Sequence, residues 1–158
     1  MAKYKVLFVC VHNSARSQMA EALLKKYGNE DFEVYSAGIE PGVLNPLVVK
    51  VLQEDENIDI SNNKTKSAFD FVKEGKLFNF VVTVCDEASA QRCPIFPGVR
   101  QRIMMSFEDP STLQGTDEEK IAKIKTIKDK IKQEVLQLKT LIQSETIKEN
   151  FPEYWKLG

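Results

Sequence analysis

Short β-rich segments alternate with helical patterns along most of the 158-residue chain. Apolar runs of strand length predict four strands, at residues 3–10, 32–36, 77–85 and 102–107. Capping residues and apolar residues at helical spacing predict helices near residues 16–28, 45–52, 67–74 and 116–138. Because strands separated by helices pair in parallel through right-handed crossovers, this order predicts an α/β domain built on a parallel sheet. We place the domain at residues 1–145 and a C-terminal tail at residues 146–158.

The charges of the chain nearly cancel. Lys and Arg number 22, Asp and Glu number 23, and the net charge is −1. This balance gives no reason to expect nucleic acid or an anionic membrane as a partner. The longest uninterrupted apolar run, residues 6–11, is too short to span a bilayer, and residues 1–5 lead into it without the longer apolar stretch of a signal peptide. We therefore expect a cytoplasmic protein that binds neither nucleic acid nor membranes.

A cysteine ends the first predicted strand, and an arginine begins the helix that follows. Five residues separate Cys10 from Arg16, and Ser17 comes next; the five are Val11, His12, Asn13, Ser14 and Ala15. The backbone N–H groups of such a loop converge on a tetrahedral anion, and the helix N-terminus adds its positive dipole end. Arg16 can bind two anion oxygens with its planar guanidinium. Residues 11–17 are therefore predicted to bind an oxyanion.

The same surroundings favour the thiolate form of Cys10, because cations and helix N-termini stabilise a negative sulfur. Ser17 can donate a hydrogen bond to that thiolate, and Asn13 tolerates the left-handed backbone that the loop needs. Cys10 is thus predicted to be a nucleophile that faces the anion. The alternative is an inert cysteine of the core, since free cysteines are often buried.

Residues 6–22, VLFVCVHNSARSQMAEA, resemble the phosphate-binding loop and first helix of low-molecular-weight protein tyrosine phosphatases and their arsenate reductase relatives. The segments YSAG (35–38), IDIS (58–61) and FEDP (107–110) are similar to further parts of that family. The resemblance implies a flavodoxin-like fold, with a four-stranded parallel sheet flanked by helices. It also implies that Asp109, in the Asp-Pro pair, is the general acid.

Two more cysteines lie near the third strand. Cys85 ends that strand, and the carboxyl ends of parallel strands share one edge of a sheet, so Cys10 and Cys85 open onto the same side. Cys93 follows in the next loop. The chain has three cysteines, an odd number, so permanent disulfides cannot use them all.

Arsenate reductases of the thioredoxin-coupled type carry cysteines at the positions of Cys85 and Cys93. The resemblance therefore implies that Cys10 attacks arsenate, Cys85 attacks Cys10, and Cys93 attacks Cys85. Thioredoxin, or glutathione with glutaredoxin, would then reduce the Cys85–Cys93 disulfide. Ser111 follows the Asp-Pro pair where phosphatases of this fold tend to carry tyrosine, which also favours the reductase. No organic cofactor is implied.

Two other functions stay open on the sequence alone. The same loop binds phosphate, so the chain could be a low-molecular-weight phosphatase that hydrolyses phosphate monoesters. A non-catalytic oxyanion-binding or redox-sensing module is the second alternative. A metal site is disfavoured because Cys10 and His12, like Cys85 and Cys93, lack the usual spacing of zinc ligands. His12 is expected to line the outside of the loop.

Relatives that hold potassium beside the loop use residues matched here by Asn13, Glu21 and Ser36, together with a nearby acid. Lys66 stands about where that acid is expected. Its ammonium group could therefore replace the potassium ion.

Overall fold

The computed structural model describes residues 3–157. The strands are β1 (Tyr4–Cys10), β2 (Phe32–Gly38), β3 (Phe80–Thr83), β4 (Gln101–Met104) and β5 (Lys156–Leu157). The α-helices are α1 (Arg16–Gly28), α2 (Pro46–Glu56), α3 (Ala68–Lys73), α4 (Glu87–Ala90) and α5 (Asp117–Gln143). Two short 3-10 helices, η1 (Asn29–Asp31) and η2 (Pro110–Thr112), complete the secondary structure. None of the helices in this described part of the chain is long and apolar enough to cross a membrane.

Helices α2 and α5 begin where their capping residues predict. Asn45 caps α2 by accepting hydrogen bonds from the backbone N–H groups of Leu47 and Val48, and Pro46 occupies the first helical position. Thr116 and Glu119 form a reciprocal capping box at the start of α5. The apolar stripe of α5 is buried along its length, so this helix packs on the domain itself.

The sheet order is β2-β1-β3-β4-β5, and the first four strands are parallel. The predicted four-stranded parallel sheet flanked by helices is confirmed. The structure adds β5, a short strand from the C-terminal tail that pairs antiparallel with β4. Because β1 lies between β2 and β3, the carboxyl end of β1 is the point where the strand order reverses, and ligands of open α/β sheets bind there.

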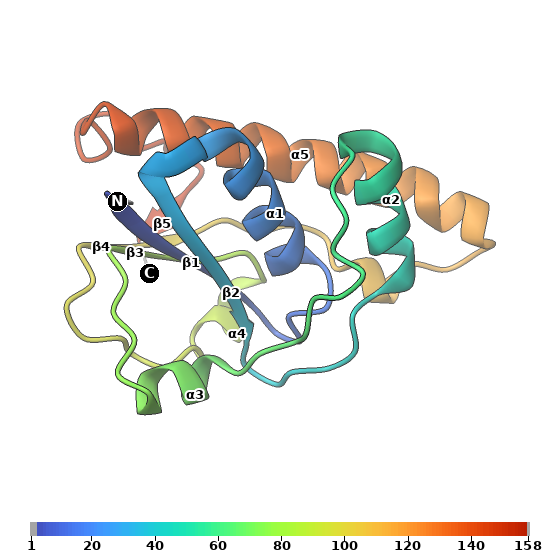
Figure 1. Ribbon diagram of the computed structural model, residues 1–158, viewed down its shortest axis with the longest axis horizontal. Coiled ribbons are helices and arrows are strands. Elements are labelled where there is room, and N and C mark those ends of the chain that lie inside the picture. The colour runs from blue at the N-terminus through green and yellow to red at the C-terminus, as the bar shows by residue number, and fades with distance from the viewer. Residues whose placement is uncertain (1–2, 158) are drawn as a thin grey trace.

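The two faces of the sheet carry separate cores. Along β1, Val6, Phe8 and Cys10 belong to one buried cluster, whereas Leu7 and Val9 belong to the other, as the alternation of a strand requires. Figure 1 shows α1, α2 and α5 over the first face and the shorter α3 and α4 on the opposite side. The larger cluster therefore lies under the long helices, and the smaller one contains Ala68 and Phe71 of α3.

Some element bounds differ from the sequence prediction. Strand β3 covers Phe80–Thr83 instead of residues 77–85, so Cys85 lies just beyond the strand that it was predicted to end. Strand β4 covers Gln101–Met104 instead of residues 102–107. Both predicted strands were too long because they followed apolar runs. An apolar run indicates that residues are buried, and it does not show where the backbone pairs with a neighbouring strand. Residues 87–90 form α4, which Asp86 caps through the N–H of Ser89. Its four residues are too few to show a helical period in the sequence.

Candidate active site

The loop after β1 is closed around the sulfur of Cys10. Cys10 is the last residue of β1, and α1 begins at Arg16. Asn13 has a φ of 53°, in the left-handed region that asparagine tolerates, and its backbone N–H lies 3.2 Å from Cys10 Sγ. The left-handed backbone that the sequence predicted for Asn13 is confirmed, and it points a backbone donor toward the sulfur.

Cys10 Sγ also lies 2.8 Å from Ser17 Oγ. Ser17 Oγ accepts a hydrogen bond from Asn13 Nδ2 at 2.8 Å, so its own hydrogen is free to point at the sulfur. Both side chains are fully buried. The Cys10 sulfur therefore has two hydrogen-bond donors on the protein side, the Ser17 hydroxyl and the Asn13 backbone N–H.

The side chain of Asn13 connects the loop to its neighbours. Its Nδ2 donates to Ser36 Oγ at 2.9 Å as well as to Ser17. Its Oδ1 accepts from Gln18 Nε2 at 3.1 Å and from the backbone N–H of Lys66 at 3.0 Å. All the hydrogen-bonding capacity of this buried amide is used, so the loop conformation is fixed before any anion binds.

Gly38 lets β2 lie directly against the loop. It is paired with Cys10 in the sheet register, and the next residues continue the contact: the N–H of Glu40 donates to the carbonyl of Val11 at 2.7 Å. A Cβ atom on Gly38 would lie 2.9 Å from backbone atoms of Val11, His12 and Asn13. From the sequence, Gly38 stands out only as part of the YSAG segment that is similar to the family. Its steric role depends on a long-range contact and was not predicted.

Arg16 and Asp109 come together at the mouth of the loop. The Arg16 side chain is almost fully buried; one Nη atom lies 3.4 Å from Asp109 Oδ2, and the other donates to the carbonyl of Phe107 at 3.3 Å. Asp109 caps η2 by accepting from the N–H of Ser111 at 2.9 Å. The Asp109 carboxylate is 29% exposed, and it is held beside the arginine by the Arg16–Phe107 hydrogen bond and by its own contact with the Ser111 N–H.

Cys85 lies on the same side of the sheet as Cys10, in the same buried cluster. It is 1% exposed, and burial raises the pKa of its thiol to about 11, against the attraction of the nearby Arg16 guanidinium. The Cys10 sulfur is close enough to add to this rise. Ser106 Oγ donates to the carbonyl of Cys85 at 3.2 Å, so Cys85 is fixed by both its neighbours and its backbone.

Cys93 is placed differently. It is partly buried against the cluster on the opposite face of the sheet, the one that contains Phe78 and Phe96. Burial raises the pKa of this thiol to about 11, with Arg102 opposing the shift. All three cysteines are free thiols. The structure brings Cys10 and Cys85 into one cluster and leaves Cys93 outside it.

His12 is exposed, and its Nδ1 lies 2.9 Å from the carbonyl oxygen of Glu40, outside the loop. Lys66 Nζ lies 3.8 Å from Glu21 Oε1, and Glu21 also accepts from Ser36, the hydroxyl that Asn13 contacts. The Lys66 ammonium group is therefore the last member of a polar network behind the loop, which runs from Asn13 through Ser36 and Glu21. Within residues 3–157, no three His, Cys, Asp or Glu side chains gather in a metal-binding cluster.

The sequence profile of the low molecular weight phosphotyrosine protein phosphatases matches residues 5–150. A curated relative named arsenate reductase, from Oceanobacillus iheyensis, is 44% identical over 131 residues, which are 83% of this chain and 91% of the relative. The arsenate reductase of Bacillus subtilis is 43% identical over 128 residues, 80% of this chain and 88% of the relative.

Among solved structures, the thioredoxin-dependent arsenate reductase of Corynebacterium glutamicum is 30% identical with a TM-score of 0.57. That match covers 86% of this chain and 63% of the longer chain. On these matches and the geometry of its loop, the chain belongs to the low molecular weight phosphotyrosine protein phosphatase family.

Proposed function

We propose that this protein reduces arsenate to arsenite with Cys10 as the nucleophile. The observation that carries the proposal is a second cysteine, Cys85, in the same buried cluster as the nucleophile of an oxyanion loop. Hydrolysis of a phosphate ester needs no second thiol, whereas reduction of arsenate needs two electrons, and a pair of thiols supplies them. The names of the curated relatives agree with this chemistry.

The first step uses the anion loop. Arg16 and the backbone N–H groups of residues 11–17 hold arsenate, and the Cys10 thiolate attacks the arsenic atom. Asp109 donates a proton to the departing hydroxide, which leaves as water. Asp109 can fill this role because its contact with Arg16 places it at the mouth of the loop. The product is a covalent adduct between Cys10 and arsenic(V).

The second step transfers the electrons. The Cys85 thiolate attacks Cys10 Sγ, the Cys10–arsenic bond breaks, and its electron pair stays on arsenic, which becomes arsenic(III). Both sulfurs are oxidised to the Cys10–Cys85 disulfide as arsenite leaves. Because burial raises the pKa of Cys85, its thiol must lose a proton when it attacks, and the nearby Arg16 favours that loss.

The third step restores Cys10. The Cys93 thiolate attacks Cys85, so the Cys85–Cys93 bond forms, the Cys10–Cys85 bond breaks and Cys10 leaves as a thiolate. Since Cys93 packs against the opposite face of the sheet, the cysteine segment, residues 85–93, must change conformation first. We propose a dithiol of the thioredoxin type as final reductant, in line with the named dependence of the Corynebacterium relative. Glutathione with glutaredoxin is the alternative reductant. We propose that the protein itself is cytoplasmic, where either reductant would be available.

Cys93→Ser should stop the enzyme after one turnover. With thioredoxin, thioredoxin reductase and NADPH, we expect one equivalent of arsenite and then a steady rate at least about 100-fold below wild type, since relay residues act as a unit. Arsenate-dependent NADPH oxidation measures the rate, and mass spectrometry should find the Cys10–Cys85 disulfide. Sustained turnover by this variant with thioredoxin would contradict the relay. If the wild type turns over with glutathione and glutaredoxin but not with thioredoxin, thioredoxin is not the reductant.

We also propose that the Lys66 ammonium group occupies the place of a potassium ion. Its contact with Glu21, behind Ser36 and Asn13, supports this. We expect wild-type activity and thermal midpoint to be the same in potassium and sodium salts of equal ionic strength. Lys66→Ala leaves Glu21 with less compensating charge, so this variant should gain stability from potassium but not from the larger tetramethylammonium ion. A clear preference of the wild type for potassium would sink the idea.

A further inference from the structure

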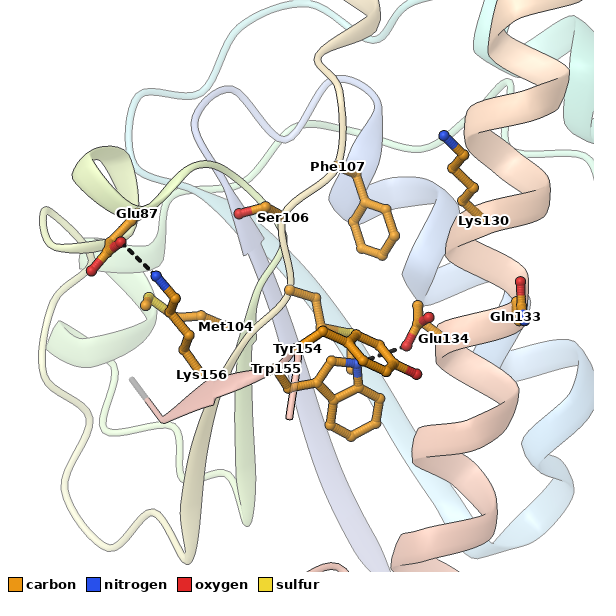
Figure 2. A pocket seen from close by; sticks show the side chains of 11 residues that line it. Glu87, Met104, Ser106, Phe107, Lys130, Gln133, Glu134, Tyr154, Trp155 and Lys156 are labelled. Carbon is orange, nitrogen blue, oxygen red and sulfur yellow. Dashed lines mark hydrogen bonds and ion pairs between the residues drawn. The ribbon is translucent and has the colours of Figure 1, made fainter. Parts of the chain in front are cut away.

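The C-terminal tail is packed against the domain beyond the end of the family match at residue 150. Strand β5 pairs with β4, with Lys156 opposite Met104. Trp155 is 3% exposed, and its Nε1 donates to Glu134 Oε2 of α5 at 2.7 Å. Figure 2 shows the Trp155 ring beside α5, at one side of an open pocket of about 360 Å³. Buried aromatic area and sheet pairing hold the tail in place.

Beyond this anchor, the tail reaches the cysteine segment. Lys156 Nζ donates to Glu87 Oε2 at 3.0 Å, and Figure 2 shows the pair at the far side of the same pocket. Glu87 is the first residue of α4, which lies between Cys85 and Cys93. The other end of the segment is held by an ion pair between Arg92 and Glu40 of the loop after β2. Two ion pairs therefore connect the cysteine segment to separate parts of the fold.

We propose that the C-terminal tail restrains the cysteine segment through Lys156, and so limits the rate at which Cys93 reaches Cys85. This inference rests on the proposed relay, because only the relay requires residues 85–93 to move. Lys156 touches neither substrate nor a reacting sulfur, so it is a positioning residue. Its contact holds α4 in the arrangement in which Cys85 is covered and Cys93 faces the opposite side of the sheet.

The strength of the contact suits a restraint that opens in each turnover. The side chains of Lys156 and Glu87 are 63% and 58% exposed, so water and salt screen their attraction. Trp155, in contrast, is buried and hydrogen-bonded. The tail therefore stays docked through Trp155 when the ion pair breaks, and α4 can move away while its restraint remains in reach.

The test measures how often Cys85 becomes accessible, and needs no arsenate. In a full-length chain with Cys10→Ser and Cys93→Ser, Cys85 is the one remaining thiol of the three. Its labelling rate with N-ethylmaleimide in native buffer, divided by its rate in guanidinium, reports opening of the segment. The variants are Lys156→Gln, Glu87→Gln and both together. Lys148→Gln is the matched control, since this exposed tail lysine has no ion-pair partner within residues 3–157.

We expect Lys156→Gln and Glu87→Gln each to raise the labelling ratio by about two- to five-fold, the range for an exposed ion pair. The double variant should be no faster than either single one, because both remove the same contact. Added salt should accelerate labelling more in the parent chain than in Lys156→Gln, where the Arg92–Glu40 pair is the one of the two that remains to be screened. In the three-cysteine enzyme, Lys156→Gln should shorten the lifetime of the Cys10–Cys85 disulfide in a quenched single turnover by a similar factor.

An unchanged labelling ratio in Lys156→Gln would overturn the proposal, and so would an equal rise in Lys148→Gln. Additive effects of Lys156→Gln and Glu87→Gln in the double variant would overturn it as well. The result is separable from the proposed function. Failure of arsenate reduction with the labelling pattern intact would remove the relay but leave the restraint, whereas normal reduction with flat labelling ratios would remove the restraint alone.

Discussion

Replacing Cys85 with serine should abolish thioredoxin-coupled reduction of arsenate while leaving hydrolysis of p-nitrophenyl phosphate intact. The loss of reduction should be at least about 1,000-fold, because a serine hydroxyl cannot attack Cys10 Sγ to form a disulfide, so arsenic does not receive its two electrons and the relay fails as a unit. Hydrolysis should stay within about three-fold of wild type, since Cys10, Arg16 and Asp109 carry it without Cys85. The steric change is small, and Ser106 still holds the backbone carbonyl of residue 85.

The measurement is a pair of assays on one preparation: arsenate-dependent NADPH oxidation with thioredoxin and its reductase, and release of p-nitrophenol. The second assay is the internal control for an intact anion loop. Retained reduction would mean that another thiol attacks Cys10, and the assignment of Cys85 would be wrong. Loss of both activities would point to damage of the loop. Brisk hydrolysis by a wild type that reduces no arsenate with either thiol system would make the phosphatase alternative the better description.

Gly38→Ala should disable the anion loop although it removes no polar group. The added Cβ would lie 2.9 Å from backbone atoms of Val11, His12 and Asn13, and these atoms cannot rotate away as a flexible side chain can. Strand β2 or the loop must shift, which displaces the N–H groups that converge on the anion. We expect kcat/KM to fall by at least about 100-fold for arsenate and for p-nitrophenyl phosphate alike, as small displacements of oxyanion donors do. Forced overpacking should also cost about 1–3 kcal/mol of stability.

Gly28→Ala is the matched control for this variant. There, the close contacts of an added Cβ are side-chain atoms of Phe32 and Leu24, remote from the loop. We expect Gly28→Ala to change the urea midpoint while leaving kcat/KM within about two-fold, since rings and methyl groups can move aside. Calorimetric titration with inorganic phosphate measures the anion affinity directly. Unchanged phosphate affinity in Gly38→Ala would show that the loop tolerates the shift, and the steric argument would fail.

Local patterns in the sequence determined much of this protein. The apolar run that ends in Cys10, the five-residue interval to Arg16 and the helix that follows predicted an oxyanion loop and its nucleophile. The capping box at Thr116 and the stripe of α5 predicted the longest helix. These features depend on residues close together in the chain, where backbone geometry and periodicity leave few alternatives.

The tertiary structure decided what long-range contacts control. It placed Asp109 against Arg16, and Gly38 against the loop, through the pairing of distant segments. It put Cys93 against the opposite face of the sheet from Cys10 and Cys85, and it docked the tail on β4 and α5. A sequence records which side chains exist and their local spacing. Which of them meet across a sheet depends on the free energy of packing the whole chain, and neighbouring residues alone do not fix that.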